Sequence, residues 1–132
     1  MPIIEDAVKT SMANFLRSKG YLSVDVKMGT RQGYDVEGRH PVNGKRLVVE
    51  CKGQAQTGNQ HARSWGNVAS AILTSLNESY DSTNTNDVGI ALPDTPEYKE
   101  RMKLLRQFFK NENIAVFGFQ SLALLNSGRS IT

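Results

Sequence analysis

The sequence predicts an α/β fold in which a mixed β-sheet carries helices on both faces, with elements in the order αβββαβαβ. Three observations predict it. Apolar residues recur at intervals of three and four in three segments, which indicates amphipathic helices. Runs in which apolar and polar residues alternate predict an antiparallel meander. Two short apolar runs, each preceded by a helical segment, predict buried strands. Such crossovers are nearly always right-handed, which favours helices on both faces of the sheet.

Length and composition agree with one domain. The chain has 132 residues, with 39% hydrophobic and 22% charged residues, 11 Gly and 4 Pro. These values exclude collagen-like, coiled-coil and fully disordered classes. We therefore predict a single domain over residues 1–132, with a core at about 3–119. A short C-terminal tail follows, in which residues 121–125 are expected to form one closing helical turn.

The first predicted helix covers residues 3–19, and Gly20 stands where a C-terminal cap belongs. Its apolar stripe consists of Ile4, Val8, Met12, Phe15 and Leu16. From Tyr21 the apolar period changes to two, which is typical of a half-buried strand. The side chains predicted to face the core are Leu22, Val24, Val26 and Met28.

A β-hairpin is predicted at Val42-Asn43-Gly44-Lys45, between two strand-like runs. Asn-Gly tolerates the positive φ angles that a two-residue type I′ turn requires. In such a turn Val42 would face Lys45. A β-bulge in either strand would change the pairing.

This pairing places Asp35 opposite Lys52 and Glu37 opposite Glu50. Because side chains alternate along a strand, Asp35, Glu50 and Lys52 should share one face. The opposite face is predicted to be apolar and to carry Val36, Leu47, Val49 and Cys51. Glu37 lies on the same face and could replace Asp35 as a ligand if a bulge shifts the strand.

The second half is predicted to add helices and buried strands. A polar loop at residues 53–60 leads to a helix at about 61–78, and residues 88–92 form a short apolar strand. Thr95-Pro96-Glu97 is typical of a helix start, and that helix reaches about residue 113. Residues 114–119 form the last apolar strand. The core aromatics are expected to be Trp65, Phe108, Phe109, Phe117 and Phe119.

Charge points to a polyanionic partner. The net charge is +3, and residues 1–66 hold ten basic and six acidic residues. The single cysteine, Cys51, cannot form an internal disulfide, which favours a cytoplasmic location. No apolar run approaches the roughly 20 residues that cross a bilayer, so we expect no membrane association.

The charged hairpin face predicts metal chemistry. Two carboxylates about 4 Å apart repel by roughly 4 kcal/mol at an effective dielectric near 20, unless a cation or a proton lies between them. Asp35 and Glu50 could therefore hold Mg²⁺, which prefers carboxylate and phosphate oxygens and lowers the pKa of bound water. The ammonium of Lys52 could orient that water or neutralise charge on a phosphate.

Glu5 falls on the inward stripe of the first helix, between Val8 and Met12. An unpaired carboxylate is costly there, so burial would argue for a partner. Alternatively, Glu5 lies in the first helical turn and complements the helix dipole.

Together, Asp35, the Glu50-Cys51-Lys52 tripeptide, the helical Glu5 and the order of elements resemble the PD-(D/E)xK phosphodiesterase superfamily, the restriction-endonuclease-like nucleases. The resemblance covers about residues 3–119. Tyr34 stands where the family name has proline.

The resemblance implies a nuclease in which Asp35 and Glu50 bind Mg²⁺, with Mn²⁺ as a substitute, and Lys52 assists the attacking water. The main-chain carbonyl of Cys51 would complete the metal shell, and Glu5 would match a helical acid near the metal. Gln60 and Asn67 are alternative matches to a glutamine that many members carry after this motif.

DNA is the expected partner, in restriction, recombination or repair, with a homodimer or a partner protein supplying selectivity. Phosphate contacts are expected from Lys27, Arg31, Arg39, Lys45 and Arg46. A phosphate-binding or base-reading surface is expected from Gln54, Gln60, Arg63 and Asn67. Two alternative hypotheses are a non-catalytic nucleic-acid-binding or assembly subunit with this fold and an unrelated scaffold with a coincidental motif.

Overall fold

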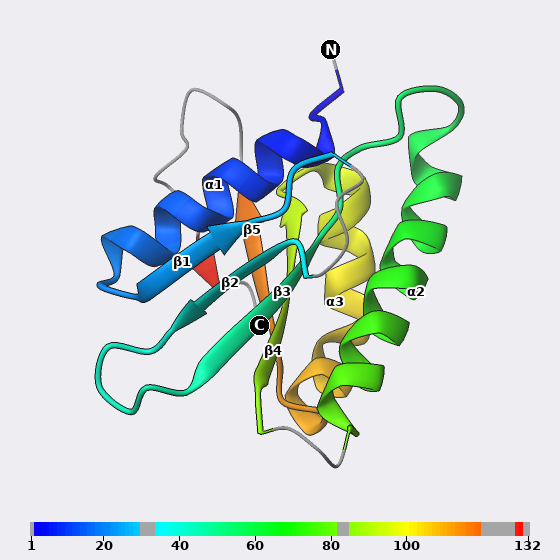
Figure 1. Ribbon diagram of the computed structural model, residues 1–132. Helices are drawn as coiled ribbons and strands as arrows, with labels where there is room; N and C mark the ends of the chain where they lie inside the picture. The colour runs from blue at the N-terminus through cyan, green and yellow to red at the C-terminus, as the bar shows by residue number, and fades with distance from the viewer. Residues whose placement is uncertain (1, 30–33, 82–84, 120–128, 131–132) are drawn as a thin grey trace.

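A six-stranded mixed sheet forms the centre of the molecule in a computed structural model, which describes residues 2–29, 34–81, 85–119 and 129–130. The strands lie in sequence order across the sheet (Figure 1). They are β1 (Leu22–Val26), β2 (Val36–Arg39), β3 (Arg46–Cys51), β4 (Asp87–Pro93), β5 (Ile114–Phe119) and β6 (Arg129–Ser130). The β3–β4 and β4–β5 pairs are parallel, and the other neighbouring pairs are antiparallel.

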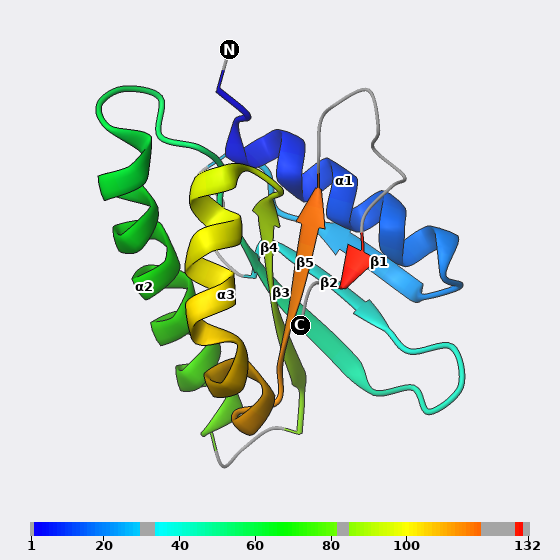
Figure 2. The ribbon, with the colours of Figure 1, turned by 180° about the vertical axis from the view of Figure 1, so that it is seen from behind.

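In the described part of the chain, three helices cover the two faces of this sheet. They are α1 (Glu5–Ser18), α2 (Gln60–Ser79) and α3 (Pro96–Asn111). The first lies on one face, and α2 and α3 lie side by side on the other, as the two opposite views show (Figures 1 and 2). The predicted α/β architecture, a mixed sheet with helices on both faces, is confirmed. The short β6 was not predicted.

Two apolar clusters hold the three layers together. The α1 cluster joins Val8, Met12 and Leu16 of α1 to Val36 of β2 and Phe117 of β5. The cluster under α2 and α3 includes Val48, Val68, Ile90, Tyr98 and Phe109. Of the stripe predicted for α1, Val8, Met12 and Leu16 are buried and Phe15 is partly buried, whereas Ile4 precedes the helix and is exposed. Gly20 follows the helix with a φ of +83°.

The hairpin turn differs from the predicted type I′ turn. Residues 40–45 connect the strands, with His40 N–H donating to Lys45 O (2.9 Å) and Gly44 N–H donating to His40 O (3.0 Å). A type I′ turn needs positive φ at both central residues, and here Gly44 has one (+70°) while Asn43 does not.

The longer loop moves the β2–β3 register by two residues. Arg39 pairs with Arg46 and Glu37 with Val48, so the predicted pairings of Glu37 with Glu50 and of Asp35 with Lys52 are wrong. Continued by one residue, the observed register sets Asp35 opposite Glu50. A shift of two keeps each side chain on its predicted face. Accordingly the four residues predicted to be apolar-facing, Val36, Leu47, Val49 and Cys51, all belong to the α1 cluster.

The apolar stripe predicted for residues 22–28 is partly wrong. In β1 the register shifts between Leu22 and Asp25, where Ser23 has a φ of +54°, and Leu22 is left 60% exposed. Met28 is also exposed, whereas Val24 and Val26 pack on the α1 cluster. The bulge disrupts the strict alternation on which the prediction depended.

Trp65 of α2 is exposed instead of lying in the core. The buried Arg101 of α3 lies against it, with its guanidinium 4.2 Å from the ring centroid. Arg101 also donates to Ser64 Oγ (3.2 Å) and His61 O (2.7 Å), so polar contacts occupy this part of the α2–α3 boundary. The buried positions of α2 are Ser64, Val68, Ala71, Ser75 and Glu78. The other predicted core aromatics are buried or partly buried.

Two predictions, the helical turn at 121–125 and the role of Arg31, lie outside the described residues. Within the described ranges, no helix has both the length and the apolar character needed to cross a membrane.

Candidate active site

Asp35 and Glu50 come together where β2 begins and β3 ends. Main-chain pairing holds Asp35 on one side, because Lys27 N–H donates to Asp35 O (2.9 Å). On the other side, Cys51 N–H donates to Asp35 Oδ2 (2.8 Å). The carboxylate of Asp35 is thereby placed against the last two residues of β3, next to the side chain of Glu50.

The ionisation of Glu50 reflects this placement. Burial raises the pKa of Glu50 most, a hydrogen bond with Asp35 and the charge of Asp35 raise it further, and the pKa reaches about 8. The ammonium of Lys52 opposes this rise, with its Nζ 3.9 Å from Glu50 Oε1. Two carboxylates that compete for one proton also attract a cation, because either would relieve their repulsion.

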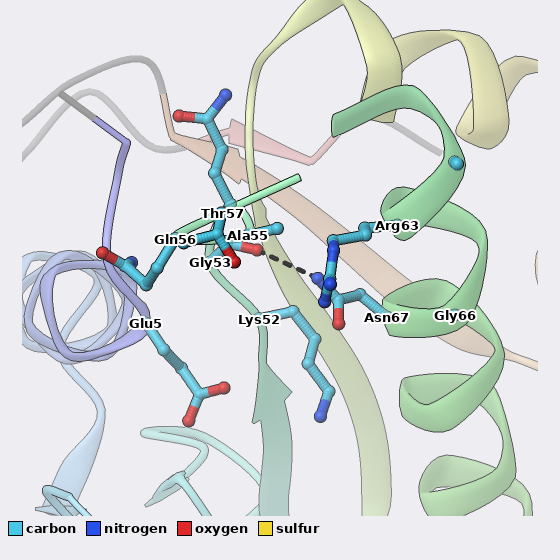
Figure 3. A pocket seen from close by; sticks show the side chains of 11 residues that line it. Glu5, Lys52, Gly53, Ala55, Gln56, Thr57, Arg63, Gly66 and Asn67 are labelled. Atoms are coloured by element: carbon cyan, nitrogen blue, oxygen red, sulfur yellow. Dashed lines mark hydrogen bonds between the residues drawn. The ribbon is translucent and has the colours of Figure 1, made fainter. Parts of the chain in front are cut away.

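Lys52 lies at a cavity of about 570 Å³ between α1 and α2. Glu5 enters it from α1 and Lys52 from the end of β3, while Arg63 and Asn67 reach in from α2 (Figure 3). The loop at residues 53–57 forms the remaining wall. The cavity thus has two cationic side chains, and one of them, Lys52, lies next to Glu50.

Hydrogen bonds hold the wall of this cavity in place. Asn67 Nδ2 donates to Gly53 O (3.3 Å) and to the hydroxyl of Tyr98 (2.8 Å), and that hydroxyl donates to Gly53 O (2.7 Å). Gln54 accepts from Ile3 N–H (2.9 Å) and donates to Glu97 (2.8 Å). Of the predicted base-reading residues, Gln54 and Asn67 therefore line the cavity as parts of its framework.

Gln60 has a different role from the one predicted. Its side chain accepts from Ala55 N–H (3.0 Å) and donates to Ala55 O (2.6 Å), which closes the loop before α2. It does not line the cavity, whereas Asn67 does.

Lys9 was not predicted, although it is 1% exposed and reaches the carboxylates from α1. Its Nζ lies 3.5 Å from Asp35 Oδ1 and 3.4 Å from Glu5 Oε2. Burial lowers the pKa of Lys9, but the charges of Asp35, Glu5 and Asp6 outweigh burial and raise it. The spacing of Glu5 and Lys9 was the available signal, since residues four apart on a helix are neighbours.

Glu5 has both a partner and solvent access. Its side chain is 42% exposed and lies beside Lys9, in the first turn of α1, so it is not buried on the inward stripe. Glu5 is the first residue of α1, so it lies at the end of the helix. Its charge still acts on the site, where it raises the pKa of Glu50.

Most of the predicted phosphate-binding residues lie away from this site. Arg39, Lys45 and Arg46 line a separate cavity of about 390 Å³ at the β2–β3 loop. Three of the predicted cations are paired with acids, Lys27 with Asp25, Lys45 with Asp87 and Arg46 with Glu37. Glu37, the alternative to Asp35, is thus bound to Arg46.

The donor set at Asp35 and Glu50 suits a hard cation. Mg²⁺ is commonly held by one or two carboxylates, with water and substrate phosphate in its other positions. Within the described part of the chain, no three His, Cys, Asp or Glu side chains are arranged to hold a metal ion. Asp35 and Glu50 are two such carboxylates, so they could hold Mg²⁺ only with water or substrate oxygens in its other positions. The contribution of the Cys51 carbonyl stays a prediction.

Cys51 itself is buried on the α1 face, as predicted. Burial raises the pKa of its thiol well above the usual value, and the nearby carboxylates raise it further. A thiol that stays protonated is a poor nucleophile. The side chain therefore acts as a small apolar residue of the core.

No protein-family model, curated protein or solved structure matches this chain.

Proposed function

We propose that this protein is a Mg²⁺-dependent nuclease that hydrolyses DNA phosphodiester bonds by attack of water. The observation that carries the proposal is the pairing of Asp35 and Glu50, with Lys52 beside Glu50. Lys52 in turn lines a cavity together with a second cation, Arg63. The motif of these residues resembles that of the PD-(D/E)xK nucleases, and we propose the restriction-endonuclease-like fold with it.

Each side chain has a role that follows from its place. Asp35 and Glu50 would hold Mg²⁺, which supplies a bound water of lowered pKa and charge stabilisation at the phosphate. Lys52 would orient the attacking water and offset negative charge that develops on the phosphate oxygens. Arg63, on the opposite wall of the cavity, would hold a backbone phosphate.

The size of the cavity is compatible with a nucleotide-sized group. Its volume is about 570 Å³, and its walls carry Lys52, Arg63 and Asn67. Phosphate contacts position a nucleic acid without reading its sequence. Selectivity would therefore come from DNA structure, from a second copy of the chain or from a partner protein.

The test is metal-dependent cleavage. We expect the purified protein to cut supercoiled plasmid or branched DNA with Mg²⁺ or Mn²⁺ and not with EDTA. Lys52→Ala should lower the single-turnover rate by about 100-fold or more, because general acid–base and electrostatic groups contribute effects of that size. Lys103→Ala, which removes an exposed lysine on α3, is the matched control and should cut at the wild-type rate.

Two outcomes would overturn parts of the proposal. Cleavage by Lys52→Ala at the wild-type rate would remove Lys52 from the mechanism. If neither DNA is cut while wild type and Lys52→Ala fold and bind DNA equally well, the chain is a non-catalytic nucleic-acid-binding subunit. Circular dichroism and fluorescence anisotropy with labelled DNA supply the folding and binding measurements.

A further inference from the structure

Lys9 is the most completely enclosed charge beside the candidate site. Its side chain is 1% exposed, and its ammonium lies among five oxygen atoms. Three are carboxylate oxygens, at 3.4 Å from Glu5, 3.5 Å from Asp6 and 3.5 Å from Asp35. Two are main-chain carbonyl oxygens, at 2.7 Å from Lys27 and 3.4 Å from Gly29.

Such a set of oxygen atoms is also what a hard divalent cation would select. The ammonium fills its centre, and it is covalently attached to α1. One oxygen of Asp35 lies beside Lys9 and the other accepts from Cys51 N–H, so both ends of this carboxylate are oriented by the protein. Lys9 therefore positions Asp35 toward Glu50.

The net charge of the site indicates how many divalent ions it can hold. The carboxylates of Glu5, Asp6, Asp35 and Glu50 and the ammonium groups of Lys9 and Lys52 form one connected group of charges. With all six ionised, two negative charges remain, which a single divalent ion balances. A second ion would give the group an excess positive charge in a partly buried place.

We propose that Lys9 is a built-in cation that takes the position of a second metal ion, so that the site binds one divalent ion through Asp35 and Glu50. Glu5 then acts as a partner of Lys9 and is not a metal ligand. This inference depends on the metal site of the proposed function, and it assigns Lys9 a positioning role.

The test is the number of Mn²⁺ ions bound per chain, measured by electron paramagnetic resonance of free Mn²⁺ during titration of the intact protein. Wild type should bind one ion. Glu5→Gln should also bind one, with affinity reduced by less than about tenfold, whereas Asp35→Asn, which removes a ligand, should lose about 100-fold. Lys9→Ala should bind two, because the freed oxygen atoms form a second site.

Lys9→Ala leaves three carboxylates without their cation and is expected to melt at a lower temperature than wild type. Mn²⁺ should then raise its melting temperature more than that of wild type, which gives a second readout. The inference is overturned if wild type binds two ions, if Glu5→Gln loses as much affinity as Asp35→Asn, or if Mn²⁺ raises both melting temperatures equally.

Cleavage assays on the same samples separate this inference from the proposed function. One bound ion with no DNA cleavage would overturn the nuclease and leave the role of Lys9 in place. Two bound ions with metal-dependent cleavage would support the nuclease and overturn the role of Lys9. The absence of Mn²⁺ binding by wild type would overturn both.

Discussion

The ionisation of Glu50 depends strongly on the fold. Its pKa is raised from 4.5 to about 8 by burial and by Asp35. Between these two pH values, Glu50 therefore keeps a proton in the folded protein that it has lost in the unfolded chain. For a carboxyl group whose pKa is raised by folding, this proton stabilises the folded state at low pH, and the stabilisation is lost as pH rises.

We therefore predict that, without metal, the free energy of unfolding falls by roughly a few kcal/mol as pH rises from about 5 to 8.5. Urea unfolding in EDTA at several pH values measures it. Glu50→Gln should flatten this dependence and be the more stable protein at pH 8.5. Mg²⁺ should restore wild-type stability at high pH. A wild-type stability that rises over this range would contradict the prediction.

Among the elements, the junction between the end of β3 and the start of α1 controls the geometry of the site. Gln54 N–H donates to Ile3 O (2.8 Å), and Gln54 Oε1 accepts from Ile3 N–H (2.9 Å). Between them, Gly53 lies so close to α1 that a Cβ atom there would be 2.5 Å from Glu5 N and 2.7 Å from Ile3 O. This close approach keeps Glu5 near Lys52.

Gly53→Ala should therefore destabilise the protein by about 1–3 kcal/mol, because backbone atoms must move to admit the methyl group. It should also weaken Mn²⁺ binding by moving α1, and with it Lys9, from Asp35. Thermal unfolding and Mn²⁺ titration measure the two effects.

Gly66→Ala is the control, since no atom lies within 4 Å of a Cβ at this exposed position of α2. It should stabilise the protein by about 0.5–1 kcal/mol through helix propensity. Equal effects of the two substitutions would show that the close contact at Gly53 does not constrain the fold.

Over the whole molecule, the positive charge of the first half is less available to DNA than the sequence suggests. Residues 1–66 carry ten basic residues, but Lys9 is buried among acids, and Lys27, Lys45 and Arg46 form ion pairs. Arg63, by contrast, is exposed and lies at the candidate site. DNA binding should therefore depend more on Arg63 than on the hairpin cations.

Arg63→Ala should weaken DNA binding and reduce the slope of log affinity against log salt by about 0.9, as expected for one lost phosphate contact. Arg46→Ala should change the slope less, because Arg46 is already paired with Glu37. Fluorescence anisotropy at several salt concentrations, in EDTA, gives both slopes. A larger change for Arg46→Ala would place the DNA on the hairpin cavity instead.

Local patterns predicted much of this fold. The three helices and the strands β3, β4 and β5 follow from apolar periodicity and apolar runs, and their ends lie within a few residues of the predicted ones. Asp35, Glu50 and Lys52 were predicted to share a face, and they lie near one another because the register error was an even number of residues. Such features depend on residues that are close in the chain, or on the alternation of side chains between the two faces of a strand.

Other features depended on contacts between distant segments. The α2 stripe could not show that Trp65 is exposed, since this depends on the polar contacts of Arg101 from α3. A lysine on an amphipathic helix is expected to face water, and Lys9 is buried because carbonyls beyond β1 and the carboxylate of Asp35 complete its oxygen shell. Periodicity within one segment predicts which side chains can be buried, but the free energy of burying a charge depends on the partners that the tertiary fold brings to it.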